Sequence, residues 1–452
     1  MIFGFLIIVI HMISYIEPRL LKGFRDFLPH TEIIRRGLIE NIENTFKTFG
    51  FVPIDTPAME YAEILLGKGG GETEKQIYRF KDNGDRDVAL RFDLTVPFAR
   101  FIALHRNELT FPFKRYHIGK VWRGENTQRG RYREFTQCDF DIIGNDSPSS
   151  DFEILLLIRA TLLNLGLDVT INVNHRALFN RFLSHIGQVE KSVEILRIVD
   201  KLSKIGEEET RKSLCEISGD VNVRKILEFI GAKGSFKEVL DRITELSGGA
   251  CAESQRLSML YQFMLDAMPN QNNEPFVLAP SITRGLDYYT GVVFETFLND
   301  MPDIGSICSG GRYDNLAGLY SKDTSISGVG SSIGLDRLLA ALESLNKLPP
   351  SNSCSIAIVC VEIEKSGQYQ ALAARFRQEG LPCEVFLETG GNPDKHLVKQ
   401  FVLAEKKGIR YVIIPGVNPL TDNITLREIA ARKNNEISIN EAITYLTSLI
   451  HG

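Results

Sequence analysis

The segment 283–295 places one arginine, one acid and two adjacent tyrosines directly before an apolar run. It reads Thr-Arg-Gly-Leu-Asp-Tyr-Tyr-Thr-Gly-Val-Val-Phe-Glu, and 292–294 has the composition of a strand. If Tyr288 and Tyr289 follow strand geometry, their side chains point to opposite faces and cannot both be core. At least one hydroxyl then needs a polar partner. The alternative is an ordinary buried strand that carries two aromatic residues.

A second segment gathers seven cations within twenty residues. They are Lys114, Arg115, Lys120, Arg123, Arg129, Arg131 and Arg133. Arg123 follows an apolar run that ends in Trp122, and Phe135 opens the next apolar run. A fixed guanidinium can stabilise the negative charge that builds on a phosphoryl group under attack, through paired hydrogen bonds. A solvated basic face is the alternative interpretation of such a run.

Six segments resemble motifs of the histidyl-tRNA synthetases, a family of class II aminoacyl-tRNA synthetases. RGLDYYTG at 284–291 resembles their histidine-specific motif, and SGGRYDNL at 309–316 resembles the second one. YHIGKVWRGENTQRGRYREFTQCDFDIIG at 116–144 resembles motif 2, and GVGSSIGLDRLLAA at 328–341 resembles motif 3. LRFDLTVPFAR at 90–100 resembles the first substrate-binding stretch, and GFVPIDTP at 50–57 resembles motif 1 mainly through its apolar strand and Pro57. The resemblance covers the chain from about Arg19 onward.

The resemblance implies a site that activates a carboxylate with ATP. By it, Arg123 stabilises the α-phosphate, Glu125 helps to hold ATP or the tRNA end, and Phe135 stacks on adenine. Arg337 binds the γ-phosphate. ATP is then a substrate that brings Mg²⁺, and no spacing of His or Cys indicates a protein metal site.

The motif 2 resemblance also implies a contact with tRNA. The loop 126–130 would meet the acceptor end, with Gln128 and Arg129 as candidate contacts. Trp122 stands where the family motif has Phe, and its ring can still pack.

For the amino acid, the resemblance implies a pocket that recognises both ends of histidine. Asp93, Thr95 and Gln137 would surround the α-ammonium group, whose three donors suit carboxylate, hydroxyl and amide oxygens. Asp141 and Tyr289 would contact the imidazole from two sides. Bacterial members more often carry Glu where this chain has Asp141, and a solvent-facing strand acid is the alternative at that position.

Arg284 is the residue to which the resemblance assigns the central catalytic role. It would contact the histidine carboxylate and the α-phosphate during adenylation, with Tyr288 packed beside it. Arg312 has two open interpretations, because it lies in the second histidine motif and could equally be an ion-pair partner of Asp314. Ser309 stands where many members have glycine.

Composition limits the class of protein. The chain has 452 residues, with 43% hydrophobic and 24% charged residues, which is ordinary for a globular protein of two or three domains. Its formal charge of -5 argues against a protein that coats nucleic acid, so tRNA contacts must come from local basic patches. Seven scattered cysteines without a Cys-x-x-Cys pair indicate a reducing compartment, and we expect the cytoplasm.

The predicted fold class is an α+β catalytic core built on an antiparallel sheet with a helical insertion, plus a C-terminal α/β anticodon-binding domain. The expected divisions are an N-terminal extension at 1–16, catalytic core at 17–174 and 276–345, a helical insertion at 175–275, a linker at 346–353 and the anticodon-binding domain at 354–452. Translation is expected to begin at Met12, so that the first eleven residues are not part of the protein. Motif 1 implies a homodimer.

Local sequence patterns predict where individual helices and strands lie. Thr31 is predicted to cap a helix that ends at Gly50, and Ser235 with Glu238 makes a capping box. Strands are predicted at 51–54, 88–92, 116–122, 135–143, 276, 292, 355–361, 384–387 and 411–414, and C-terminal helices at 369–379 and 396–407.

One alternative function stays open at this point. A regulatory paralogue of histidine biosynthesis, an ATP phosphoribosyltransferase regulatory subunit, has the same fold without catalysis. Such paralogues tend to lose the catalytic arginines and the C-terminal domain, whereas this chain retains Arg123, Arg284 and Arg337 and has about a hundred residues after the linker. A synthetase for another amino acid is a third possibility, which the RGLDYYTG segment disfavours.

Overall fold

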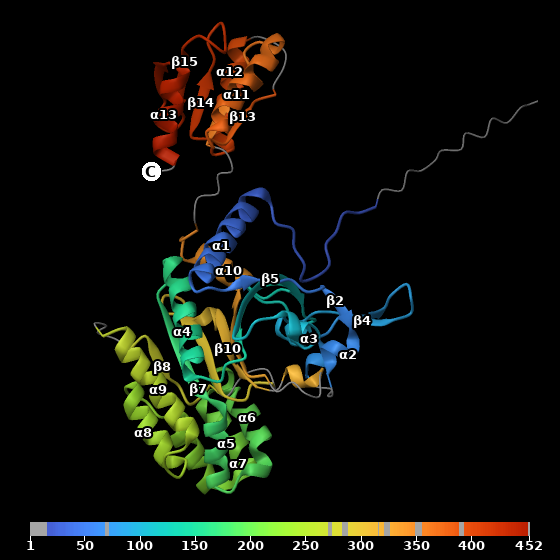
Figure 1. Cartoon of the computed structure of the whole chain (residues 1–452), viewed down its shortest axis with the longest axis vertical. Helices are drawn as coiled ribbons and strands as arrows, with labels where there is room; N and C mark the ends of the chain where they lie inside the picture. Colours follow the sequence, from blue (N-terminus) through green and yellow to red (C-terminus); the bar gives the residue numbers. More distant parts are fainter. Residues whose placement is uncertain are drawn as a thin grey trace, which may run out of the picture. The chain divides into compact units, whose positions relative to one another are not determined.

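The computed structural model describes residues 16–67, 72–269, 274–282, 288–314, 316–320, 326–348, 355–387 and 393–450. The chain divides into two compact units, one made of 1–26 with 37–348 and the other of 27–36 with 349–452 (Figure 1). The helix α1, Pro29–Thr48, contains the boundary between them. It begins two residues before Thr31, so the prediction that Thr31 caps this helix is wrong. Pro29 takes the first helical position instead, where its missing N–H costs no hydrogen bond.

The first unit is built on one large, mostly antiparallel sheet. Its described strands lie in the order β1-β5-β6-β11-β10-β9-β7-β8. Their bounds are β1 Val52–Pro53, β5 Phe113–Trp122, β6 Glu134–Ile143, β7 Val169–His175, β8 Phe276–Leu278, β9 Val292–Leu298, β10 Cys308–Tyr313 and β11 Gly328–Gly334. The pairs β1–β5 and β7–β8 are parallel, and the other neighbouring pairs are antiparallel. The predicted antiparallel core is confirmed.

Helices and a small sheet surround the large sheet. They are α2 Ala62–Leu66, α3 Thr95–His105, α4 Pro148–Asn164 and α10 Leu335–Ser344, with β2 Met59–Tyr61, β3 Arg79–Lys81 and β4 Asp87–Leu90 in the order β2-β4-β3. The hydroxyl of Ser147 caps α4 by accepting from the N–H of Ser149. The apolar side of α3 buries Phe98 and Ile102 together with Ile143 of β6, which fixes α3 next to that strand.

A group of helices lies between β7 and β8 in the sequence. They are α5 Arg176–His185, α6 Ser192–Val199, α7 Leu202–Ile230, α8 Phe236–Leu246 and α9 Ala252–Ala267, and Figure 1 shows them gathered beside those strands. Phe182 of α5 stacks on Phe229 of α7 with ring centroids 4.4 Å apart, which joins the two helices through an aromatic core. The capping box of Ser235 and Glu238 is present at the start of α8, as predicted.

The second unit contains a mixed sheet in the order β13-β12-β14-β15-β16. Its elements are β12 Ile356–Ile358, α11 Ser366–Gln378, β13 Cys383–Val385, α12 Pro393–Lys406, β14 Tyr411–Ile414, β15 Ile424–Glu428, β16 Lys433–Ile437 and α13 Ile439–Ile450. The first three strands of the order are parallel, and β14–β15 and β15–β16 are antiparallel. Gly380 and Gly408 follow α11 and α12 with φ of +74° and +69°, so they end these helices as the sequence predicts.

Candidate active site

Strand β6 places three polar side chains on one face of the large sheet. Gln137, Asp139 and Asp141 alternate along the strand and are 8%, 2% and 2% exposed. Gly330 of β11 pairs with Asp141, and an added Cβ there would lie 1.9 Å from Asp141 Oδ1. A glycine on β11 is therefore required for this carboxylate to fit between the strands.

Asp141 is held in a buried ion pair. Its Oδ2 lies 2.6 Å from Nη2 of Arg115, the residue that faces it across the β5–β6 ladder. The hydroxyl of Tyr313 donates to Oδ1 at 2.5 Å. The guanidinium of Arg115 also lies 4.0 Å from the ring centroid of Phe98. Burial raises the pKa of Asp141, while Arg115 acts in the opposite direction. The alternative that Asp141 is a solvent-facing strand acid is therefore wrong.

Asp93 reaches the same region from the segment between β4 and α3. Its Oδ1 accepts the backbone N–H of Val96 at 3.0 Å, which stabilises the first turn of α3, where Thr95 is the first residue. Burial raises the pKa of Asp93 to about 6, and Arg123 and Arg115 act against that rise. A carboxyl with this pKa readily changes protonation state when a charged ligand approaches.

Tyr288 and Tyr289 lie side by side rather than on opposite faces of a strand. Their ring centroids are 4.9 Å apart, and both rings pack against the cluster that contains Phe98. The prediction from strand geometry is wrong because β9 begins only at Val292, so the tyrosines precede the strand. Burial raises the pKa of both hydroxyl groups, and Thr95 acts against that rise at Tyr288.

Arg123 lies at the end of β5, beside the start of β6. Its Nε donates to the carbonyl oxygen of Phe92 at 2.8 Å, and its guanidinium lies 5.2 Å from the ring centroid of Phe135. Glu125 has one oxygen 3.8 Å from Arg123 Nη1 and the other 3.3 Å from Arg131 Nη1. The guanidinium, the acid and the aromatic ring named by motif 2 are thus in contact.

Arg337 reaches the same end of β6 from α10. Gly130, with φ of +68°, approaches so closely that an added Cβ would lie 3.2 Å from the Cα of Arg337. Nη2 of Arg129 donates to Oγ of Ser344 at 2.6 Å, which also holds the loop against α10. Gln128 forms a backbone bridge with Arg131 inside the same loop.

An ion pair joins α10 to β6 and to the N-terminal segment. One oxygen of Asp336 accepts the backbone N–H of Thr136 at 2.7 Å, and the other accepts from Nη2 of Arg25. The guanidinium of Arg25 lies 3.9 Å from the ring centroid of Tyr132. Asp336 therefore connects the start of α10, which carries Arg337, to the strand that carries Phe135.

Comparison with known proteins identifies the family. A family model described as histidyl-tRNA synthetase matches residues 23–338, and one described as an anticodon binding domain matches residues 355–449. A Treponema denticola protein named histidine–tRNA ligase is 49% identical over 96% of this chain and 98% of its own length. The chain belongs to the histidyl-tRNA synthetase family. It is therefore an aminoacyl-tRNA synthetase.

Other relatives agree with this membership. A histidine–tRNA ligase of Rhodopirellula baltica is 44% identical over 94% of this chain and 96% of its own length. The crystal structure of histidyl-tRNA synthetase from Nostoc sp. PCC 7120 has a TM-score of 0.82 at 31% identity, covering 95% of this chain and 100% of that one. A Bacillus halodurans C structure described as ATP phosphoribosyltransferase regulatory subunit/histidyl-tRNA synthetase has a TM-score of 0.72 at 21% identity and shows the shared fold alone.

Arg284 and Arg312, two residues of the synthetase's histidine-specific motifs, contribute no described side chain to this site. Arg284 lies outside the described residues. Arg312 is 2% exposed and pairs mainly with Asp151 of α4, at 2.6 Å, while Asp314 is 3.6 Å away. Asp151 also binds Arg256 of α9 at 2.6 Å, so these charges tie β10 to the helical part.

Sequence reasoning assigned no role to Arg25, Arg115, Asp139 or Tyr313 in this region of the synthetase. A signal existed for Asp139, because it lies two residues from both Gln137 and Asp141 on a predicted strand and must share their face. Arg115 carried no such signal, since its partner lies on another strand and the register was unknown.

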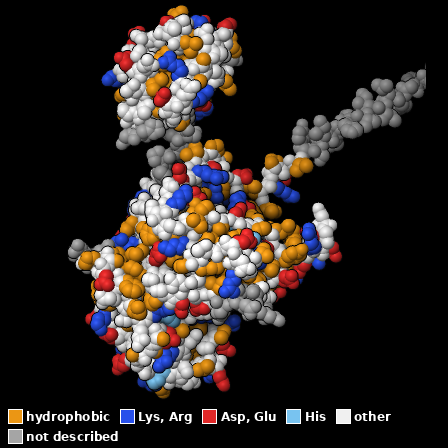
Figure 2. All heavy atoms as spheres, viewed as in Figure 1, with side chains coloured by type: hydrophobic (Ala, Val, Ile, Leu, Met, Phe, Trp, Pro, Cys, Tyr) orange, Lys and Arg blue, Asp and Glu red, His pale blue; other side chains and the backbone are white. Residues whose placement is uncertain are grey.

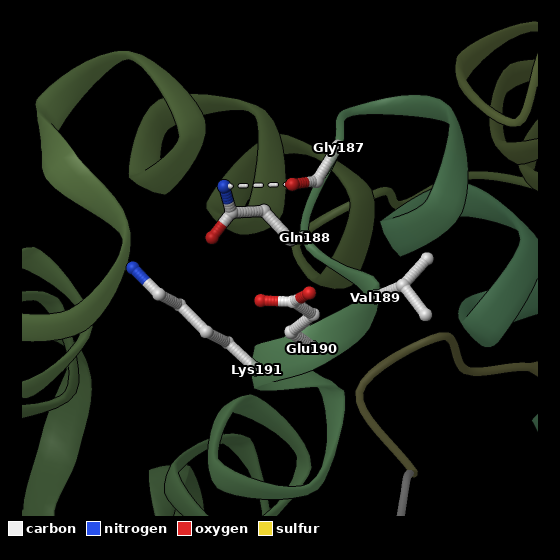
Figure 3. A pocket seen from close by; sticks show the side chains of 5 residues that line it. All are labelled: Gly187, Gln188, Val189, Glu190 and Lys191. Atoms are coloured by element: carbon white, nitrogen blue, oxygen red, sulfur yellow. Dashed lines mark hydrogen bonds between the residues drawn. The ribbon is translucent and has the colours of Figure 1, made fainter.

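A separate hollow lies between α5 and α6 of the synthetase. It has a volume of about 380 Å³ and is lined by the consecutive residues Gly187, Gln188, Val189, Glu190 and Lys191. Figure 3 shows the side chains of Gln188, Glu190 and Lys191 on one side and Val189 on the other, with Gln188 donating to the carbonyl of Gly187 at 3.3 Å. A single loop forms this hollow, and none of the predicted site residues lines it.

The surface charge of the synthetase is mixed. On the face drawn in Figure 2, basic and acidic side chains alternate over both units. Within the described ranges, no group of three His, Cys, Asp or Glu side chains is placed to hold a metal ion. In the same ranges no helix is long and apolar enough to cross a membrane.

Proposed function

We propose that this synthetase activates L-histidine with ATP to histidyl-adenylate and then transfers the histidyl group to the 3′ end of tRNA(His). The observation that carries the proposal is a set of buried acceptors supplied by β6 and by the segment before α3. Oδ2 of Asp93 and Oε1 of Gln137 are buried and have no hydrogen-bond donor within the described structure. Unpaired buried acceptors are costly, so a ligand with N–H groups fits this place.

Each site residue has a proposed role. Asp93, Thr95 and Gln137 hold the α-ammonium group, and Asp141 with Tyr289 contacts the imidazole. Tyr288 packs beside Arg284, which contacts the histidine carboxylate and the α-phosphate. Fixed donors aimed at the developing charge need no reorganisation during the reaction, which is the basis of their catalytic effect.

The ATP site is proposed at the end of β6. Arg123 and Arg337 bind the α- and γ-phosphates, Phe135 stacks on adenine, and Glu125 helps to hold ATP or the tRNA end. Arginine suits this task because its planar fork matches phosphate oxygens. Mg²⁺ is proposed to arrive with ATP, since hard phosphate oxygens are its usual ligands.

The tRNA is proposed to contact both units. Gln128 and Arg129 on the loop of motif 2 would meet the acceptor end, and the second unit would bind the anticodon. The divisions expected from the sequence, with a helical insertion at 175–275 and the anticodon-binding domain at 354–452, are kept as part of this proposal. The cytoplasm is the proposed compartment.

A homodimer is proposed through the region of motif 1. Val52, Met59, Tyr61 and Phe80 are large apolar side chains with exposed fractions of 47%, 44%, 50% and 45%. They come from β1, at the edge of the large sheet, and from β2 and β3. Analytical ultracentrifugation should give twice the chain mass, and a monomer at micromolar concentration would contradict this assembly.

Pyrophosphate exchange across the twenty amino acids tests the proposed function. Histidine alone should support exchange of labelled pyrophosphate into ATP, because only it fills a pocket built for an imidazole and an ammonium. Exchange with a different amino acid would point to another synthetase. Absence of exchange with histidine, in a folded protein, would contradict the proposed reaction.

Replacing Arg25 by methionine should raise the KM for ATP more than the KM for histidine. The change removes the ion pair with Asp336 and loosens the connection between α10 and β6. We expect the KM for ATP to rise about 10-fold, the range for losing one charge-assisted hydrogen bond, with the KM for histidine nearly unchanged. Exchange kinetics at varied ATP and histidine measure both constants.

Arg86→Met is the matched control for this change. Arg86 pairs with Asp82 at 2.6 Å in the turn between β3 and β4, where loss of an exposed ion pair has little effect. Equal changes in the two KM values of the Arg25 variant would show a general loss of folding instead of a positioning role.

A further inference from the structure

We propose that Asp139 is a specificity-determining residue of the amino-acid pocket, where its free carboxylate oxygen accepts a hydrogen bond from an N–H group of bound histidine. The inference rests on the proposed function and adds a residue to which the motifs assign no role. Asp139 is 2% exposed, and its Oδ1 has no hydrogen-bond partner within the described structure.

The orientation of Asp139 follows from its neighbours on β6 and β11. It shares the strand face of Gln137 and Asp141, and Ser332 faces it across the β6–β11 ladder. Nε2 of Gln137 donates to Oγ of Ser332 at 2.7 Å, and the same hydroxyl acts to lower the pKa of Asp139. Ser332 thus holds the amide of Gln137 and faces Asp139 across the ladder.

Three buried acceptor oxygens are left without a donor in this place. They are Oδ2 of Asp93, Oε1 of Gln137 and Oδ1 of Asp139. Asp93 and Asp139 are near enough to raise each other's energy when both are ionised. An ammonium group presents three N–H donors and a positive charge, so it satisfies such a set better than a neutral ligand does.

Charged and titratable groups face Asp139 from every strand and segment packed around it. They are Arg91 after β4, Asp93 before α3, Arg115 and His117 on β5, Asp141 on β6, Cys308 on β10, and Tyr288 and Tyr289 before β9. His117 lies opposite Asp139 in the ladder, and burial lowers the pKa of its imidazole to about 3, so it supplies no positive charge at neutral pH. Arg115 is already paired with Asp141.

Histidine binding should therefore release a proton from this pocket. Burial raises the pKa of Asp139 to about 7, and Arg115 opposes that rise. Below this pH the free carboxyl holds a proton, and the arriving cation favours the ionised form. The proton leaves on binding, so the affinity for histidine should rise as the pH increases from 6 toward 7.

Titration calorimetry of the full-length protein at pH 6.5, in two buffers of different ionisation enthalpy, measures the released proton. In Asp139→Asn, the release should fall relative to wild type, and the Kd for histidine should increase about 10- to 100-fold. The Kd for ATP should change less than threefold. Asn keeps the size of the side chain, removes its charge and replaces one acceptor oxygen with an NH2 donor.

Cys138→Ala is the matched control. Cys138 is buried on the same strand, but its side chain points to the opposite face. Replacing it by alanine therefore changes the packing there without changing the pocket. It should leave the proton release unchanged. Unchanged release and histidine affinity in Asp139→Asn, in a protein with wild-type Tm, would overturn the proposal. Absence of histidine binding in the wild type would instead overturn the proposed function.

Discussion

Replacing Arg123 by alanine is expected to slow formation of histidyl-adenylate about 100- to 1,000-fold, the usual cost of removing one fixed donor from a developing charge. The side chain is positioned for this task by the carbonyl of Phe92, at 2.8 Å from Nε, and by the ring of Phe135. The rate of adenylate formation in a single turnover measures the effect directly. The KM for histidine should change little, because Arg123 is proposed to act on phosphate.

Two further variants accompany this experiment, one that separates the charge of Arg123 from its geometry and one that serves as a control. Arg123→Lys keeps the charge but loses the planar fork, so its rate should lie between wild type and Arg123→Ala. Arg86→Ala, which changes an exposed arginine in the turn between β3 and β4, should retain the wild-type rate. A rate within threefold of wild type for Arg123→Ala, with normal folding, would remove Arg123 from the proposed chemistry.

Replacing Asp141 by alanine should affect both stability and histidine binding. The change leaves the guanidinium of Arg115 buried without its partner, which is 2.6 Å away in the native protein. Breaking a buried ion pair in this way costs about 3–5 kcal/mol of unfolding free energy. Histidine binding should weaken more than ATP binding, as measured by calorimetry with each ligand, because Asp141 is proposed to contact the imidazole.

The double variant Arg115→Met, Asp141→Ala distinguishes these two effects. Removing both charges eliminates the uncompensated cation, so the Tm should recover most of the loss seen in Asp141→Ala. Histidine binding should stay weak, because the recognising carboxylate is still missing. Recovery of histidine binding together with stability would show that Asp141 has only a structural role.

Local patterns predicted much of the fold. The strands β5 and β6, the helical stretch after β7 and the capping box at Ser235 all follow from neighbours within a few residues. The errors have local causes as well. Thr31 lies inside α1 because Pro29 can start a helix, and the two tyrosines are neighbours because β9 starts at Val292.

The sequence by itself determined the family and the identity of most candidate residues, since the motifs and the alternation of Gln137 and Asp141 are contained in short segments. Only the tertiary structure decided how charges pair. Arg312 forms its shortest ion pair with Asp151, which is 161 positions away, and a longer one, at 3.6 Å, with its near neighbour Asp314, while Arg25 binds Asp336 across 311 positions. The physical reason is that strand order and register bring distant side chains together, while burial makes each unpaired charge costly enough to select one partner.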